Sequence, residues 1–181
     1  MGPGQLHRIG GIGRAARGVT FIGALYPVPK IALLPLLMLL LGIGEASKWA
    51  VIAIGAFFPI LINTMAGVMG IARIYHDVGR NFGASRIHRY QTIALPGAAP
   101  MILAGIRLGW GLALLLIVAA EFVAADAGLG YMIWQSWQTF LIERMYVGLT
   151  VISLLGYLSF VALDRITAKL VPWQAGGGAR T

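Results

Sequence analysis

The chain has 181 residues, of which 59% are hydrophobic and 11% are charged, and its formal net charge is +8. A water-soluble domain of this length carries charged residues about twice as often, so the composition excludes an ordinary soluble protein. The sequence contains no cysteine, which excludes disulfides, thiolate nucleophiles and cysteine-based metal sites. The composition therefore predicts an integral membrane protein.

The first 18 residues are basic, rich in glycine and free of acidic residues. No small-residue cleavage site follows them, so we interpret residues 1–18 as a cytoplasmic leader that is retained. Their glycines are not followed by the Gly-Lys-Ser/Thr of a phosphate loop, and no nucleotide site is predicted there.

Four apolar regions are long enough to cross a bilayer, because a helix needs about 20 mostly apolar residues to span ~30 Å of hydrocarbon. They are predicted to be helices, since lipid cannot satisfy unpaired backbone groups and the regions lack strand-type alternation. The predicted fold class is thus an all-α polytopic helical bundle with four transmembrane helices, at residues 19–43, 49–70, 96–120 and 145–163.

Three positions inside these spans are candidates for a pathway or for an internal hydrogen-bond network. Pro35 interrupts the first span, and a broken helix is tolerated in a bilayer only against protein or water. Asn63 is predicted either to hydrogen-bond another helix or to contact a substrate. Arg107 needs a partner, because an unpaired guanidinium costs at least about 2.5 kcal/mol at depth. It either anchors an internal network or lines a route used by an anion.

The longest polar passage, residues 71–96, lies between the second and third spans and carries four arginines against a single acid. Its apolar spacing predicts two short amphipathic helices. Gly83 is expected to end the first helix in the left-handed conformation, and Ser85 is expected to cap the second, which ends at Leu95-Pro96. The predicted structure is a helix-turn-helix elbow at a membrane surface.

The connection between the last two spans, residues 121–144, carries three acids and one base. Residues 128–131 are predicted to form a turn, and residues 132–141 a short helix at the outer interface. The aromatic side chains of this helix either anchor it in the interface or offer a docking surface or gate to a partner. Residues 171–181 are expected to form a flexible cytoplasmic tail.

The basic residues are distributed unevenly, and ten of the fourteen Lys and Arg lie in residues 1–17, 71–96 and 164–181. The positive-inside rule therefore places both termini and the elbow in the cytoplasm, and four spans return the chain to the same side. The predicted localisation is multi-pass, in the cell inner (plasma) membrane.

The sequence carries no enzyme signature. The three histidines lie in predicted cytoplasmic segments without metal-ligand spacing, and no protease or hydrolase motif occurs. No acidic residue lies deep in a span, which disfavours a proton-driven carrier. We predict no catalytic residue, no metal and no cofactor, and we expect energy for transport to arrive through the elbow.

The elbow resembles the cytoplasmic loop of ABC importer permease subunits, whose pattern is EAA, three residues, G, nine residues, I, one residue, LP. Asp77 keeps the acid of the EAA position, whereas its two alanines are absent. The segments AFFPILINT, GASRIHRYQTIALPGAAPMILAGIRLGWG and AEFVAADAGLGYMI are similar to the nitrate/sulfonate/taurine group of these permeases, over roughly residues 18–170. The positions that match the loop pattern in register are Gly83, Ile93, Leu95 and Pro96.

This resemblance implies a membrane-spanning permease subunit of an ATP-driven importer for a small anion of the aliphatic sulfonate, taurine or nitrate type. The implied partners are cytoplasmic ABC ATPase subunits that use the ATP, a periplasmic or surface solute-binding protein, and a second permease copy in a homodimer. Nucleic acid is not expected. The implied ATPase-coupling residues are Asp77, Gly83, Ala84, Ser85, Arg86, Ile93, Leu95 and Pro96. The implied docking residues for the binding protein are Gly128, Leu129, Gly130 and Tyr131.

Members of this group usually have six spans, and this chain begins about where their third would start. Residues 19–170 are therefore expected to form a partial transmembrane domain that lacks the family's first two helices. The alternative hypothesis is a truncated, non-transporting membrane scaffold or a degenerate permease.

Overall fold

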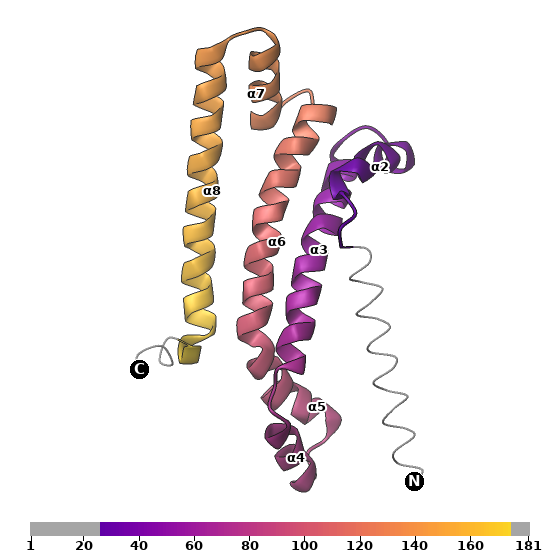
Figure 1. The fold of residues 1–181 in the computed structure, drawn as a ribbon, viewed down its shortest axis with the longest axis vertical. Helices are drawn as coiled ribbons and strands as arrows, with labels where there is room; N and C mark the ends of the chain where they lie inside the picture. The colour runs from indigo at the N-terminus through magenta and orange to yellow at the C-terminus, as the bar shows by residue number, and fades with distance from the viewer. Residues whose placement is uncertain (1–25, 175–181) are drawn as a thin grey trace.

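The computed structural model describes residues 26–174, which contain helices and no strand (Figure 1). Three long helices run along the length of the molecule: α3 (Glu45–Met69), α6 (Leu95–Ala124) and α8 (Ile142–Leu170). The predicted all-α class is confirmed.

Short helices join the long ones. α4 (Arg73–Asn81) and α5 (Arg86–Arg89) form an elbow between α3 and α6, and α7 (Leu129–Gln138) connects α6 to α8 at the other end of the molecule (Figure 1). α2 (Leu34–Leu41) lies beside the first turns of α3, toward the same end as α7. We call these the elbow end and the α7 end. The last turns of α8 point toward the elbow end.

Three helical stretches of the described residues are long and apolar enough to cross a membrane: α3, α5 together with α6, and α8. The prediction of four spans exceeds this number. The described part of the predicted first span contains four residues of 3-10 helix, Lys30–Leu33, and the eight residues of α2. At about 2.0 Å per residue of 3-10 helix and about 1.5 Å per residue of α-helix they reach about 20 Å, which is short of a ~30 Å hydrocarbon layer.

The sequence around α2 explains why this helix is short. Pro29 precedes the 3-10 turn, and Gly42 follows α2 with φ +86°, a conformation that does not continue a helix. Gly44 is the N-cap residue that precedes α3. Residues 19–25 of the predicted span lie outside the described residues, as do the predicted leader and residues 175–181 of the predicted tail.

The other predicted spans correspond to α3, α6 and α8, with changed boundaries. α8 continues beyond the predicted end of its span to Leu170, and a 3-10 turn follows it, Pro172–Gln174. The first described residues of the predicted tail are therefore ordered into a turn at the end of α8.

α3 and α6 pack closely because glycines of α6 face the backbone of α3. A Cβ added at Gly105 would lie 3.1 Å from the Cα of Ile60 and 3.1 Å from the carbonyl oxygen of Pro59. A Cβ added at Gly109 would lie 3.0 Å from the carbonyl oxygen of Ala56. Small residues of this kind let membrane helices approach closely enough for dispersion forces to hold them together.

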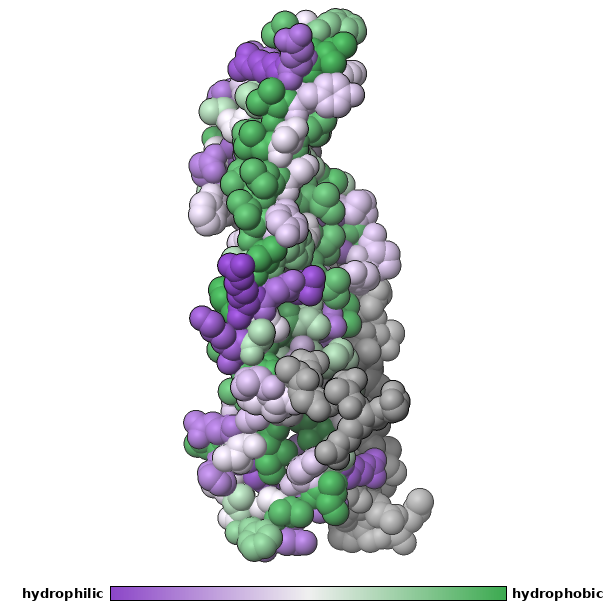
Figure 2. Space-filling view, turned by 90° about the vertical axis from the view of Figure 1, so that its left-hand side faces the viewer, coloured by the Kyte–Doolittle hydropathy of each residue, from purple (hydrophilic) through white to green (hydrophobic). Residues whose placement is uncertain are grey.

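The one cluster of packed, fully buried apolar side chains among the described residues is small and lies toward the α7 end. There, Leu34 of α2 packs with Val51 of α3 and Ala120 of α6. Figure 2 shows the side of the molecule that faces left in Figure 1, with mainly hydrophobic surface between hydrophilic residues at its top and across its middle. Such an apolar belt suits contact with lipid or with further apolar helices.

Candidate functional site: the elbow and the α6–α8 contact

The turn between α4 and α5 has the geometry of a glycine-terminated helix. Gly83 has φ +66°, and its N–H donates to the carbonyl of Arg80 at 3.0 Å. The N–H of Ala84 donates to the carbonyl of Gly79 at 2.9 Å. These two hydrogen bonds make a Schellman motif, in which the left-handed residue closes the helix and reverses the chain. The predicted conformation of Gly83 is confirmed.

The two arms of the elbow are held against each other. The Oγ of Ser85 accepts a hydrogen bond from the N–H of His88 at 3.2 Å, which confirms the predicted cap of α5. Gly79 of α4 is buried, and a Cβ there would lie 3.0 Å from the Cδ1 of Ile93 and 3.2 Å from the Cγ of Arg89. The close fit makes the elbow a compact unit.

The prediction that the second elbow helix ends at Leu95-Pro96 is wrong. α5 passes through a π-helical turn, Tyr90–Ala94, directly into α6. Pro96 is the second residue of α6 and follows the π-helical turn directly, and its fixed φ suits a helix. The elbow is consequently joined to α6 by unbroken helical backbone.

The elbow leaves an apolar ridge exposed next to its arginines. The side chain of Phe82, at the turn, is 85% exposed. Several exposed large apolar side chains on one short segment are typical of an interaction site. The ridge consists of Ile74, Tyr75, Val78, Phe82, Ile87 and Tyr90. Among the predicted coupling residues, Ala84 and Ile93 are half-buried, and the exposed ones are Asp77, Gly83, Ser85, Arg86, Leu95 and Pro96.

Arg107 finds its partner on α8. Its Nη1 lies 2.9 Å from Oδ1 of Asp164, and its guanidinium carbon lies 5.9 Å from the centre of the Phe160 ring. One turn along α6, the Nε1 of Trp110 donates to the Oγ of Ser159 at 3.0 Å. Sequence reasoning missed these α8 residues, although Asp164, an acid at the end of an apolar run, was a visible signal for the ion pair.

Pro35, Asn63 and Arg107 occupy separate places. The Nδ2 of Asn63 donates to the carbonyl of Pro59 at 2.8 Å, within α3, so the predicted hydrogen bond to another helix is not the one formed. The carbonyl of Pro59, one helical turn before Asn63, is within reach of the Asn63 amide. Across the helix contact, Gly105 of α6 lies against the Asn63 Cβ and has no polar side chain to offer. Pro35 is exposed in the first turn of α2.

The turn predicted at residues 128–131 is instead the start of α7. Gly128 precedes the helix with φ +126°, and residues 129–131 form its first turn. The Oε2 of Glu121 accepts a hydrogen bond from the N–H of Gly130 at 2.6 Å. A carboxylate at this position satisfies a free donor and complements the positive end of the helix dipole. Of the predicted docking residues, Gly128 is exposed, Leu129 and Tyr131 are half-buried, and Gly130 is buried.

We expect Glu121→Ala to loosen the start of α7. The buried N–H of Gly130 would lose its acceptor, which costs about 1–3 kcal/mol. Hydrogen exchange of the first α7 amides should become about tenfold faster, the change that corresponds to about 1.4 kcal/mol. Asp126→Ala, at an exposed acid of the same connection, is the matched control and should leave exchange unchanged. Equal exchange in both variants would contradict a capping role for Glu121.

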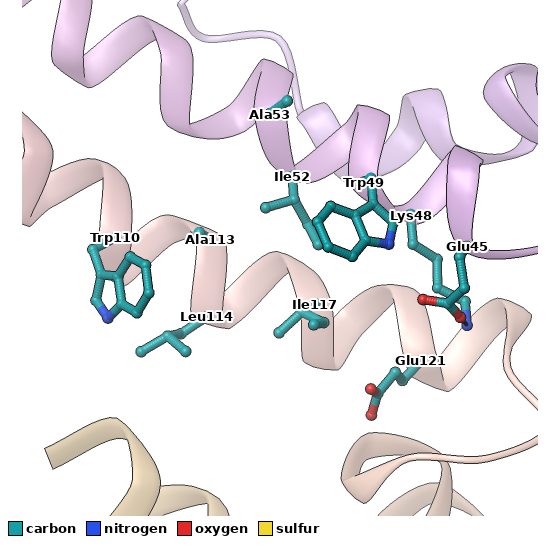
Figure 3. Close-up of a pocket in the computed structure, with 10 residues that line it drawn as sticks. All are labelled: Glu45, Lys48, Trp49, Ile52, Ala53, Trp110, Ala113, Leu114, Ile117 and Glu121. Carbon is teal, nitrogen blue, oxygen red and sulfur yellow. Dashed lines mark hydrogen bonds and ion pairs between the residues drawn. The ribbon is translucent and has the colours of Figure 1, made fainter. Parts of the chain in front are cut away.

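A pocket of about 360 Å³ lies along α3 and α6 toward the α7 end. In Figure 3 its charged residues, Glu45, Lys48 and Glu121, gather at one end, and Trp110 stands at the other. The Nζ of Lys48 lies 2.6 Å from Oε1 of Glu45, and the Lys48 side chain is 10% exposed. Apolar side chains line the middle. The pocket is therefore an apolar trough with a charged mouth.

Comparison with known proteins gives a family match for residues 12–174, to the model described as binding-protein-dependent transport system inner membrane component. The taurine transport system permease protein TauC of Escherichia coli is 34% identical, over 91% of this chain and 60% of the relative. The putative aliphatic sulfonates transport permease protein SsuC of Bacillus subtilis is 38% identical, over 81% of this chain and 53% of the relative. The nitrate import permease protein NrtB of Synechocystis is 36% identical, over 79% of this chain and 50% of the relative. The chain thus spans about half to three-fifths of the length of these relatives.

Proposed function

This chain belongs to the family of inner-membrane components of binding-protein-dependent transport systems, and we propose that it is the membrane-spanning permease subunit of an ATP-driven importer. The proposed substrate is a small anion of the aliphatic sulfonate, taurine or nitrate type, the substrates in the names of its relatives. ATP would be hydrolysed by a separate ATPase subunit.

The elbow is the observation that carries this proposal. It combines the loop pattern centred on Gly83 with an exposed apolar ridge and with unbroken helical backbone into α6. A groove on a cytoplasmic ATPase could receive the ridge, and rigid-body motion of that ATPase would then move α6 directly. In this proposal Asp77 and Arg86, both exposed beside the ridge, supply polar contacts at the rim of the interface.

The charges at the two ends support an orientation with the elbow in the cytoplasm. The elbow end carries the four arginines of residues 71–96 together with Arg165 and Lys169 of α8, against Asp77 and Asp164. The α7 end has acids in excess, with Glu45, Glu121, Asp126 and Glu143 against Lys48 and Arg144. The positive-inside rule assigns the more basic end to the cytoplasm.

We place the contact with a solute-binding protein at the α7 end. The aromatic residues after the first turn of α7 support this surface better than the buried Gly130 does. Phe140 is 85% exposed and has φ +55°, and Trp137 is 57% exposed. Exposed aromatic side chains are common anchors of protein interfaces. A second permease copy would cover part of the apolar surface of the long helices.

The proposal is tested by purification and transport. The chain is co-expressed with an ABC ATPase subunit and a solute-binding protein of a related transport system, reconstituted with them into liposomes, and supplied with ATP inside. We expect ATP-dependent uptake of taurine, an alkanesulfonate or nitrate, and none when the ATP is replaced by a non-hydrolysable analogue. A correctly inserted complex that moves none of the three would favour the non-transporting scaffold.

A further inference from the structure

The face of α6 that lines the pocket continues toward the elbow end and reaches Arg107. Trp110, Leu114, Ile117 and Glu121 line the pocket, and Arg107 precedes Trp110 by three residues. Spacings of three and four residues place side chains on one face of a helix. One face of α6 therefore carries Glu121 at the charged end of the pocket, the apolar side chains that line the pocket, and the guanidinium of Arg107.

The guanidinium at the end of this face is accessible. The Arg107 side chain is 56% exposed and that of Asp164 is 46% exposed. About half of each side chain is left uncovered by the described residues, so a small anion can approach the guanidinium from its uncovered side and compete with the carboxylate. The two parallel N–H donors of an arginine fork can also pair with two oxygens of nitrate or sulfonate, as they do with a carboxylate.

The partners of Arg107 sit on a different helix from the elbow. Asp164 and Phe160 belong to α8, which follows α6 through α7, whereas Arg107 moves with α6 and hence with the elbow. The Trp110–Ser159 hydrogen bond joins the same two helices one turn away. A displacement of α6 relative to α8 would therefore open both contacts.

We propose that Arg107 is an anion subsite on the elbow side of the pocket, and that Asp164 is its exchangeable internal counter-ion. A small oxyanion replaces the Asp164 carboxylate at the guanidinium when α6 and α8 separate. The carboxylate returns when the anion leaves, so Arg107 is neutralised in both states and the carboxylate limits how tightly an anion is held. This inference rests on the proposed import of small anions and assigns the residues that would handle them.

The subsite is tested with the full chain in lipid nanodiscs, with methanesulfonate as the probe and sodium chloride at matched ionic strength as the reference. Asp164→Asn removes the competing carboxylate, and methanesulfonate should bind about fivefold more tightly, because no internal anion then competes for the guanidinium. Arg107→Gln should weaken binding by more than about tenfold, and Arg107→Lys should weaken it less. Arg165→Gln, at the neighbouring basic residue of α8, is the control and should bind as the parent chain does.

A merely structural ion pair gives a different result. Asp164→Asn and Arg107→Gln would then lower the unfolding temperature to a similar extent, and methanesulfonate affinity would be the same in all variants, which overturns the subsite. Transport separates this outcome from failure of the proposed function. If the complete complex imports methanesulfonate and Arg107→Gln leaves KM unchanged, the subsite is wrong and the importer stands. If the nanodisc titration behaves as expected and the complete complex imports no anion, the subsite stands without the importer.

Discussion

Replacing Gly83 by valine is expected to uncouple the elbow from its ATPase while leaving the long helices folded. Gly83 has φ +66°, a conformation that a β-branched residue adopts only at a cost of about 1–3 kcal/mol. The Schellman turn would relax, and Phe82 and the ridge residues on either side of the turn would change their relative positions. Co-purification of the ATPase should fall about tenfold or more, since about 1.4 kcal/mol corresponds to that factor.

Gly83→Asn is the matched control for this prediction. Asparagine tolerates the left-handed conformation far better than valine does, so the turn should keep its shape. Space is not the issue, because a Cβ at Gly83 has no neighbour within 4 Å. If both variants lost the ATPase equally, or if Gly83→Val retained it, the conformation of the turn would not be what the partner recognises.

Replacing Gly105 by alanine is expected to destabilise the whole bundle, although alanine is the better helix former. The added Cβ would lie 2.8 Å from the Cβ of Asn63 and 3.1 Å from backbone atoms of Pro59 and Ile60, so α3 and α6 must move apart. Overpacking of this kind costs about 1–3 kcal/mol. A thermal unfolding scan of the purified protein should show a lower midpoint.

The same substitution at Gly156 of α8 provides the control. A Cβ there would meet one atom, the Cδ1 of Leu114, at 4.0 Å, an ordinary contact distance. Gly156→Ala should therefore leave the midpoint unchanged or raise it, because alanine favours the helix by about 1 kcal/mol. If Gly156→Ala lowered the unfolding midpoint and Gly105→Ala left it unchanged, the close-packing account would be refuted.

Local patterns in the sequence predicted the elbow well. The conformation of Gly83 and the cap at Ser85 depend on residues within one or two turns, and both are as expected. The prediction failed at Pro96, where a proline was taken as the end of a helix. The fixed φ of proline is compatible with a helix, and the π-helical turn before Pro96 carries the backbone through.

Contacts between helices were less predictable. Whether Asn63 meets a partner on another helix, and which residue Arg107 meets, depend on how α3, α6 and α8 rotate about their axes, which hydropathy does not determine. The predicted count of four spans exceeds the three found in the described residues for a related reason. The first apolar region was long enough by composition, but its prolines and glycines limit the helical part of its described residues to a 3-10 turn and α2, which packs on α3 and α6.

The sequence by itself determined that this is a helical membrane protein with a basic elbow and a recognisable permease loop. The length of the apolar segments determines that they lie in lipid, and the local spacing of apolar and polar residues determines where short helices form. The tertiary structure alone decided that Arg107 meets Asp164, that Glu121 caps α7, and that the elbow continues into α6. The Arg107–Asp164 and Glu121–Gly130 contacts depend on distances between segments that are separate in the chain. The continuation into α6 depends on a helix junction that tolerates proline. Such geometry follows from packing, and no local pattern specifies it.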